Sequence, residues 1–344
     1  MLAAVTEGVG SMAVRERPEP GAPGPGEVVI RPEAIGLCGS DYHFFAGELS
    51  DAAGGSQFPR VLGHEVAGTL VAVGEGCRPE LTVGERVAVY PLHACGSCYP
   101  CRAGRPNACD NFQLIGIHLD GGLQGLLATS HSQVFPIRAQ DAVVAALAEP
   151  MSIAVRAVTR GRVEPAERVV VLGAGPIGQC ISVVARERGA AVLMVDLVAD
   201  RLELAESLGA SVLPWSGVEA IVSSAREWAG GGGPPVVFDA TGAPDAVRAM
   251  VDMVSSAGRA VQVGMSNAEV PIRIGSLTEK EVDLLGVSCC GADEFGQAVG
   301  VVERNAGALA QLISHQFDLV QAPEAIRFAM DNPNQVMKVV IRGE

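Results

Sequence analysis

Four cysteines lie within one short segment of the chain, at Cys95, Cys98, Cys101 and Cys109. Their spacing, C-x2-C-x2-C-x7-C, brings together four soft thiolates, which can close the tetrahedral coordination sphere of a zinc ion. A closed site of this kind leaves no position for a substrate, so it stabilises the fold and does no chemistry. Iron–sulfur clusters also use four cysteines, but no second cluster motif accompanies these four. The sequence therefore predicts a structural zinc site in a lobe at about residues 91–112.

A second group of potential metal ligands precedes this segment. Cys38 lies in a glycine-bracketed turn, and His64 is followed directly by Glu65. A catalytic zinc uses about three protein ligands and keeps one position open for water or substrate. Cys38, His64 and one carboxylate would meet that need, and the carboxylate could be Glu65 or Glu149. The residues thus predict two kinds of zinc site, one closed and one open.

A glycine fingerprint, Gly173-Ala-Gly-Pro-Ile-Gly178, lies further along the chain. An apolar strand runs into it and a helix leaves it, which is the context of dinucleotide-binding sites. The first glycine permits a tight turn, the second lets the backbone approach a pyrophosphate, and the third allows the helix to pack closely on the strand. The helix N-terminus attracts the phosphate charge. The predicted cofactor contacts in this turn are Gly173, Gly175, Pro176, Ile177 and Gly178.

An acidic residue, Asp196, ends the next strand about 20 residues later, where a carboxylate accepts hydrogen bonds from the adenosine ribose hydroxyls. It would repel a 2′-phosphate, so the sequence favours NAD over NADP. The alternative is that Asp196 only caps the end of its strand. Arg201 lies nearby and could contact the ribose, stabilise its own helix or tolerate a 2′-phosphate.

The elements that position these residues change in character along the chain. Residues 1–150 contain short strands broken by Gly and Pro, which predicts a compact β-rich domain. In residues 151–290 apolar strands alternate with helices, which predicts a parallel sheet covered on both faces. Residues 291–344 return to mixed helix and strand and are expected to rejoin the first region. The expected strands include residues 27–31, 66–73, 86–90, 169–172, 192–195, 236–238, 259–263, 282–285 and 338–341, with helices from about Pro176 and over 201–208.

Charge and cysteine content limit the partners. The chain has 39 acidic and 25 basic residues, a net charge of −14, which argues against nucleic acid or an anionic membrane as a partner. The N-terminus lacks the basic start and long apolar stretch of a signal peptide. No uncharged apolar run approaches the roughly 20 residues of a membrane helix. The nine cysteines are an odd number with four clustered, which favours metal ligation in a reducing compartment. We therefore expect a cytoplasmic protein.

Several segments of the chain, in this order, resemble the zinc-dependent medium-chain dehydrogenase/reductase superfamily. They are GLCGSDYH, VLGHEVAG, VGERVAV, the four-cysteine lobe, AEPMSIAVRAV, VVVLGAGPIG, DLVADRLELAESLGA, FDATG and VQVGM, and they cover essentially the whole chain. Within the superfamily the chain is most similar to the polyol (sorbitol-type) and sugar-acid (L-galactonate/L-gulonate 5-dehydrogenase-like) dehydrogenases. The resemblance implies a two-domain α/β fold, in which a GroES-like β-rich catalytic domain carries both zincs and a Rossmann NAD-binding domain is inserted.

The resemblance also implies roles for individual residues near the open zinc. It makes Cys38 and His64 ligands, with Glu65 or Glu149 as a third or exchangeable ligand. Asp41 matches an acid that orients the metal histidine. The proton relay and the carboxamide contacts are implied in the same way. Ser40 and His43 match the residues that pass the hydroxyl proton through the cofactor ribose to solvent, and the contacts to the nicotinamide carboxamide fall on Val263, Gly264 and Val287.

The chain departs from the sorbitol pattern near the expected substrate. Cys289 and Cys290 stand where the sorbitol enzymes carry Arg and Tyr, and Phe44 replaces a tyrosine of the pocket. The loss of these polar groups argues against sorbitol itself. His118 and Asp120 could compensate by binding a substrate hydroxyl or carboxylate, or they could be loop residues without a contact.

The implied activity is the NAD(H)-linked interconversion of a secondary alcohol of a polyol or sugar acid and its ketone. The zinc would act as a Lewis acid toward the hydroxyl group. Alternatives are the same chemistry on a cyclitol, aminocyclitol, threonine or simple alcohol, or a zinc-bearing regulator without activity, which would have no need of the open site. The resemblance also implies a homo-dimer or homo-tetramer, and a strand near residues 282–290 would be an exposed sheet edge unless it pairs with a partner.

Overall fold

The computed structural model describes residues 1–49 and 57–343. The chain divides into two compact units. The first unit comprises Met1–Ser152 and Gly291–Glu344, and the second unit comprises Ile153–Cys290. The second unit is therefore continuous in sequence and is inserted between the two segments of the first.

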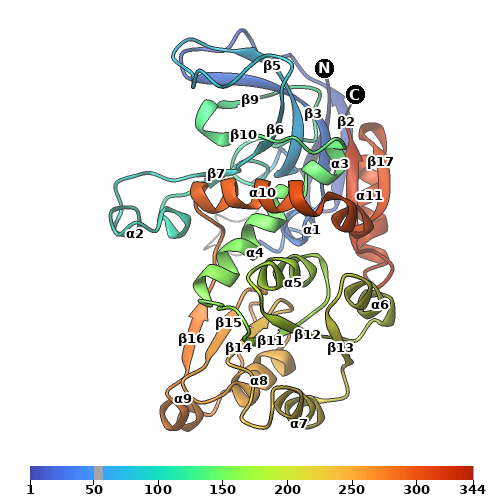
Figure 1. Ribbon diagram of the computed structural model, residues 1–344. Helices are drawn as coiled ribbons and strands as arrows, with labels where there is room; N and C mark the ends of the chain where they lie inside the picture. The colour runs from blue at the N-terminus through green and yellow to red at the C-terminus, as the bar shows by residue number, and fades with distance from the viewer. Residues whose placement is uncertain (50–56, 344) are drawn as a thin grey trace. The chain divides into compact units, whose positions relative to one another are not determined.

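The first unit is built mainly from antiparallel strands (Figure 1). Its main sheet has the order β10-β6-β5-β3-β18-β17, with β9 also pairing with β3, and a smaller sheet has the order β2-β1-β4. Because β18 pairs with β3, the segment after the second unit adds strands to the sheet that the first segment begins. The strands are β1 (Leu2–Gly8), β2 (Ser11–Glu16), β3 (Glu27–Gly36), β4 (Arg60–Val61), β5 (Glu65–Val73), β6 (Arg86–Val89), β7 (Leu92–His93), β8 (Gln113–Leu114), β9 (Leu127–Ser130), β10 (Val134–Pro136), β17 (Ile313–Asp318) and β18 (Lys338–Arg342).

Branched and aromatic side chains fill the core of the first unit. Ile30, Ile35 and Leu70 from β3 and β5 are fully buried and pack with Phe44 of the first helix. Residues of this kind suit both the pleated sheet and a dry interior. The helices that lie wholly in this unit are α1 (Gly39–Ala46), α2 (Tyr99–Arg102), α3 (Ala142–Ala145), α10 (Ala292–Leu309) and α11 (Ala322–Asp331).

One stretch, Ala142–Arg160, is long and apolar enough to cross a membrane by length and composition alone. It comprises α3 and α4 (Ala148–Arg160), and most of it is buried inside the structure. A buried core helix of a globular domain passes the same test, so this stretch is weak evidence for a membrane span.

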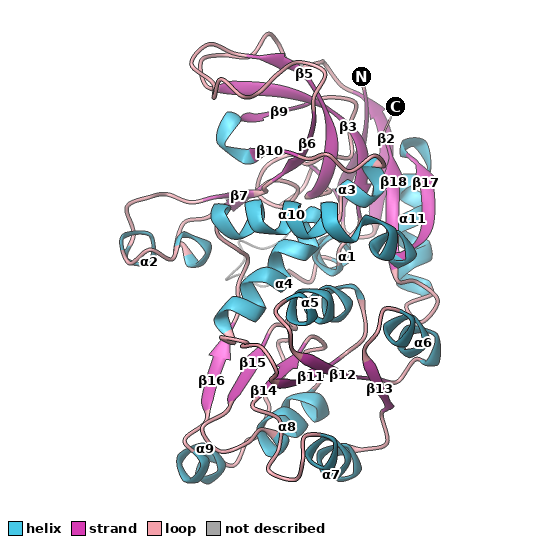
Figure 2. Cartoon of the chain, viewed as in Figure 1, coloured by secondary structure: helices cyan, strands magenta, loops and turns pink. Residues whose placement is uncertain are grey.

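The second unit is a parallel sheet with helices on both faces (Figure 2), as predicted. The strand order is β13-β12-β11-β14-β15-β16, so the order reverses between β11 and β14. Ligands of such sheets bind at the carboxyl ends of the strands beside this reversal. The strands are β11 (Arg168–Leu172), β12 (Ala191–Asp196), β13 (Ser211–Pro214), β14 (Val236–Asp239), β15 (Arg259–Gln262) and β16 (Asp283–Gly286), and the helices are α5 (Pro176–Glu187), α6 (Ala199–Ser207), α7 (Val218–Trp228), α8 (Pro244–Met253) and α9 (Ile274–Lys280).

Candidate active site

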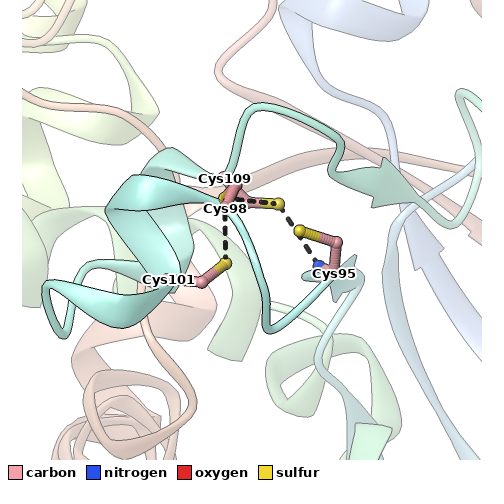
Figure 3. A group of neighbouring side chains, drawn as sticks. All are labelled: Cys95, Cys98, Cys101 and Cys109. Carbon is pink, nitrogen blue, oxygen red and sulfur yellow. Dashed lines mark hydrogen bonds between the residues drawn. The ribbon is translucent and has the colours of Figure 1, made fainter.

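The four clustered cysteines point toward one another on the segment between β7 and β8 (Figure 3). All four sulfur atoms lie within 4.8 Å of one another, and none forms a disulfide. The Sγ of Cys98 is 3.3 Å from that of Cys101 and 3.7 Å from that of Cys109. A tetrahedral zinc with Zn–S bonds of about 2.3 Å requires sulfur separations of about 3.8 Å. The cluster therefore fits a four-coordinate zinc ion.

The electrostatics of this cluster also favour a bound cation. Backbone hydrogen bonds from Ser97 and Cys98 lower the pKa of Cys95 to about 5. Burial and the neighbouring thiols of Cys98 and Cys109 raise the pKa of Cys101 to about 12. Four thiolates so close together cannot all be charged at neutral pH without a positive ion among them, because like charges oppose one another's ionisation.

The second predicted group comes together within the first unit. Cys38 directly precedes α1, and His64 directly precedes β5. Strand pairing places Gly36 of β3 opposite Glu65 of β5, so the two turns lie at the same end of the sheet. The potential ligand atoms of Cys38, His64 and Glu65 lie within 4.8 Å of one another. One thiolate, one imidazole and one carboxylate form a donor set that suits a catalytic zinc.

A buried carboxylate, Asp41, fixes the geometry of this group. Its Oδ2 accepts a hydrogen bond from the backbone N–H of Cys38 at 2.9 Å, which caps α1. Its Oδ1 accepts from the N–H of Gly63 at 3.2 Å and lies 3.5 Å from Nδ1 of His64. Burial alone would lower the pKa of His64, but Asp41 and Cys38 together raise it well above its usual value. Asp41 therefore connects both turns and aligns the imidazole.

Glu65 is held by a residue that the sequence did not point out. Lys338 of β18 is buried, and its Nζ donates to both carboxylate oxygens of Glu65, at 2.7 and 2.9 Å, and to the carbonyl of Leu37 at 3.1 Å. Glu65 reaches β18 across β3 because Gly36 lies between them, and a Cβ at Gly36 would come within 2.0 Å of Glu65 Oε2. Burial would lower the pKa of Lys338, but Glu65 raises it above its usual value.

Glu149 lies near the start of α4 and is 8% exposed. Among the residues that the structure describes, its side chain has no hydrogen-bond partner. Burial raises its pKa to about 7 and Glu65 adds to this rise, whereas His64 and Lys338 oppose it. A buried carboxylate with unused acceptor oxygens and a raised pKa is suited to bind a metal ion, which would replace its proton.

The raised pKa values lead to a pH-dependent prediction for metal binding. We expect zinc affinity at the Cys38 group to weaken as pH falls from 8 to 6, because protons on Glu149 and His64 must leave before either can bind zinc. Each displaced proton contributes about tenfold per pH unit below the group's pKa. Competition with a chromophoric zinc chelator measures the affinity. In Glu149→Gln the slope of the logarithm of zinc affinity against pH should be smaller by up to one proton. An unchanged slope would contradict the assignment of Glu149 as a zinc ligand.

The two predicted relay residues differ in exposure. Ser40 is partly buried, and its Oγ lies 3.3 Å from Nε2 of His64. His43 is exposed, and its Nδ1 lies 3.2 Å from Oε2 of Glu48. Ser40 is thus beside the metal donors and His43 faces solvent, as a proton relay would require.

The three candidate substrate contacts already have partners within the first unit. Phe44 is fully buried and packs edge to face on Phe58. Asp120 accepts hydrogen bonds from Arg17 at 2.8 Å and from the backbone N–H of Val61 at 3.0 Å. His118 accepts from the N–H of Leu114 through Nδ1 at 3.0 Å. These contacts give each residue a structural role, and substrate binding by them stays a prediction.

In the second unit the glycine fingerprint forms a turn that leads from β11 into α5. Gly173 has a φ of 97°, in the region that favours glycine, and a Cβ at Gly178 would lie 1.8 Å from the carbonyl oxygen of Gly173. Asp196, at the end of β12, accepts from the N–H groups of Ala174 and Val198 at 2.6 and 2.8 Å. The glycines therefore allow a tight turn and close packing of α5 on β11, and Asp196 supports the turn through its hydrogen bond from Ala174.

The other predicted cofactor contacts lie at the same ends of neighbouring strands. The guanidinium of Arg201 is close to Gly175, with 4.0 Å between its Nη1 and the position of a Cβ on that glycine. Val263 and Gly264 follow β15, and Val287 follows β16. Asp239, which ends β14, is fully buried and was not singled out from the sequence. The signal in the sequence is the motif FDATG. There an acidic residue lies between a buried strand and a Thr-Gly turn, so many backbone N–H groups are close to its carboxylate.

The fold and both sites define the class of protein: a zinc-binding oxidoreductase that uses a nicotinamide dinucleotide. Two family models agree, the alcohol dehydrogenase GroES-like domain over residues 24–139 and the zinc-binding dehydrogenase model over residues 176–304. The 2-dehydro-3-deoxy-L-galactonate 5-dehydrogenase of Pseudoalteromonas atlantica is 33% identical over 93% of this chain and 92% of its own length. The chain belongs to the zinc-type alcohol dehydrogenase family and is an enzyme acting on an alcohol carbon.

Solved structures agree with this assignment. A zinc-binding dehydrogenase from Sinorhizobium meliloti 1021 bound to NADP is 30% identical, with a TM-score of 0.89 over 99% of this chain and 98% of that one. An alcohol dehydrogenase from Escherichia coli CFT073 in complex with NADH is also 30% identical, with a TM-score of 0.88 over 99% of both chains. The predicted fold class and enzyme class are confirmed.

Proposed function

We propose that this enzyme interconverts a secondary alcohol of a polyol or sugar acid and the corresponding ketone, using zinc and NAD(H). The observation that carries this proposal is the group of Cys38, His64 and Glu65, whose ligand atoms lie within 4.8 Å of one another and of which His64 and Glu65 are buried. Glu149, whose carboxylate has no hydrogen-bond partner among the described residues, is an electrostatic neighbour of His64 and Glu65. The activity of the sugar-acid relative supports the substrate class, as does the sequence resemblance to polyol dehydrogenases.

The side chains present have distinct tasks in this reaction. When bound, zinc supplies Lewis acidity at the alcohol oxygen and the nicotinamide supplies the hydride acceptor. Ser40, beside His64, would take the proton of the substrate hydroxyl while it gives up its own hydroxyl proton, and exposed His43 would release a proton to solvent after the transfer through the cofactor ribose that the resemblance implies. Asp41 keeps His64 oriented through its hydrogen bonds to both turns.

We further propose two zinc ions per chain, one in the cysteine cluster and one at the Cys38 group. For the second site Cys38 and His64 are the fixed donors. Lys338 holds Glu65 in place through both of its oxygens. Glu149 has no such partner among the described residues, so Glu149 is the carboxylate that can exchange with substrate.

The cofactor proposed is NAD in preference to NADP. The carboxylate of Asp196 lies at the end of β12, where it would repel a 2′-phosphate. Arg201, close to Gly175, is the residue that could reduce this repulsion. The two structural relatives, one with NADP and one with NADH, show that both cofactors occur on this fold.

A substrate panel tests the proposed function. Zinc-loaded enzyme is supplied with polyols, sugar acids, cyclitols, threonine and simple alcohols, with NAD and NADP in parallel, and the absorbance of the reduced nicotinamide is followed. We expect turnover of polyols or sugar acids with NAD. Turnover confined to threonine or simple alcohols would overturn the substrate class, and faster turnover with NADP would overturn the cofactor preference.

We also propose that the enzyme is a cytoplasmic homo-oligomer that pairs through β16. This strand lies at the end of the second unit's sheet, and it pairs only with β15 among the described residues. Leu284, on this strand, is 44% exposed. An open edge with an exposed apolar residue favours pairing with the same strand of a second copy. Sedimentation velocity would show a dimer or tetramer, and a monomer at micromolar concentration would contradict this arrangement.

A further inference from the structure

We propose that Asp239 and Gln262 are positioning residues that hold the binding surface for the nicotinamide half of the cofactor. The inference rests on the proposed function, since it requires a dinucleotide cofactor. This surface consists of the two turns that follow β14 and β15 in the second unit, residues 240–243 and 263–265.

The strand order places the nicotinamide half at these turns. A doubly wound sheet binds a dinucleotide across the point where its strand order reverses, with one mononucleotide on each half of the sheet. Here the reversal lies between β11 and β14. The glycine turn after β11 and Asp196 after β12 serve the pyrophosphate and the adenosine. The carboxyl ends of β14, β15 and β16 are then left for the nicotinamide half.

Asp239 ties the two turns together. It is fully buried, and its carboxylate accepts four hydrogen bonds within the part of the chain that the structure describes. Oδ1 accepts from the backbone N–H and the hydroxyl of Thr241 at 3.0 and 2.6 Å. Oδ2 accepts from the N–H of Gly242 at 2.8 Å and from Nε2 of Gln262 at 2.6 Å. One side chain therefore satisfies donors from the ends of both strands.

The turns that Asp239 joins are packed too tightly to move separately. A Cβ on Gly264 would lie 2.3 Å from the backbone nitrogen of Gly242, and a Cβ on Gly173 would lie 2.6 Å from the methyl of Thr241. The N–H of Gly264 also donates to the carbonyl of Asp239 at 2.9 Å. A shift of the Thr241 turn would therefore displace Gly264.

The side-chain oxygen of Gln262 lacks a hydrogen-bond donor among the described residues. Its Nε2 faces two oxygens, Oδ2 of Asp239 at 2.6 Å and the carbonyl of Gly264 at 2.8 Å, which identifies that atom as the amide nitrogen. Its Oε1 is buried and has no partner among the described residues. A buried acceptor without a donor is costly, and a ligand N–H or O–H can remove that cost. The nicotinamide carboxamide and the adjoining ribose hydroxyls supply such donors.

The test compares two ligands on the full-length, zinc-loaded enzyme. NADH contains the nicotinamide half, and ADP lacks it. In Asp239→Asn the amide would place a donor where Oδ2 now accepts from Gly242 and Gln262. We expect NADH affinity, measured by its fluorescence, to fall at least about tenfold, while ADP affinity changes less than about twofold. If Asp239→Asn does not fold, Gln262→Met, which keeps the length and removes the amide, gives the same comparison.

Asp245→Asn is the matched control, because it makes the same change in an exposed ion pair with Arg248 in the same unit. It should leave both affinities unchanged. Equal loss of NADH and ADP binding in Asp239→Asn would show a merely structural role, and unchanged binding of both would show no role; either result overturns the inference. If the wild-type enzyme itself binds no NADH, the proposed function fails instead.

Discussion

Cys38→Ser is expected to lose about one zinc ion per chain and to reduce turnover by roughly 1000-fold, equivalent to about 4 kcal/mol of transition-state stabilisation. Serine has nearly the shape of cysteine, but its hydroxyl is a poor zinc ligand at neutral pH. The remaining donors, His64 and Glu65, would then hold the metal with one fewer strong bond. Elemental analysis gives the zinc content, and the best substrate of the panel gives the turnover.

A matched control distinguishes metal loss from general damage. Cys77→Ser makes the same change in the same unit, at a partly buried cysteine whose thiol donates to the carbonyl of Glu27. This variant should keep both zinc ions and full turnover. If Cys38→Ser retained two zinc ions and turnover within tenfold of the wild type, Cys38 would not be a ligand of the catalytic metal.

The second large effect is expected from Lys338→Met, which should destabilise the first unit by about 3–5 kcal/mol. The substitution keeps the length of the side chain and removes its charge. Glu65 would then be a buried carboxylate without its ion-pair partner. Differential scanning calorimetry should show the transition of the first unit lowered on the order of 10 °C.

The double variant Glu65→Gln/Lys338→Met tests this explanation. Because it removes both charges, it should recover much of the stability that Lys338→Met loses. Arg342→Met serves as the control, since it removes an exposed positive charge from the same strand. The explanation would be wrong if the double variant were no more stable than Lys338→Met, or if Arg342→Met were equally damaging.

Residues close together in sequence were the ones that sequence reasoning identified best. The cysteine cluster spans only residues 95–109, so its spacing alone indicates a metal site. The glycine turn at 173–178 is equally local, because the strand, the turn and the helix follow one another directly. In both cases the chain brings the groups together whatever the distant parts of the fold do.

Lys338 shows what the sequence could not reveal. It lies 273 residues from Glu65, and the two meet only because β18 lies next to β3 and β3 next to β5. A lysine at the start of the apolar run Lys338–Ile341 looks like an ordinary strand end. Its role depends on strand order and on the space left by Gly36, neither of which follows from local pattern.

The boundaries of elements were less predictable than their existence. The expected strand 282–285 is β16 at Asp283–Gly286, and the expected helix 201–208 is α6 at Ala199–Ser207. Ends shift by a residue or two because caps and turns, rather than the apolar pattern, decide where an element stops. The two-residue strand β4 was not among the expected strands, since its pairing with β1 depends on a contact between residues far apart in sequence.

The insertion of one unit within the other has a consequence for biosynthesis. The second unit is a single continuous segment, so it can fold as soon as residue 290 has left the ribosome. The first unit must wait for β18, which fills the sheet position between β3 and β17 and brings the counter-charge for Glu65. Nascent chains interrupted before residue 338 would therefore have a finished second unit and an incomplete first unit. The synthesis of β18 thus determines when the enzyme can first become active.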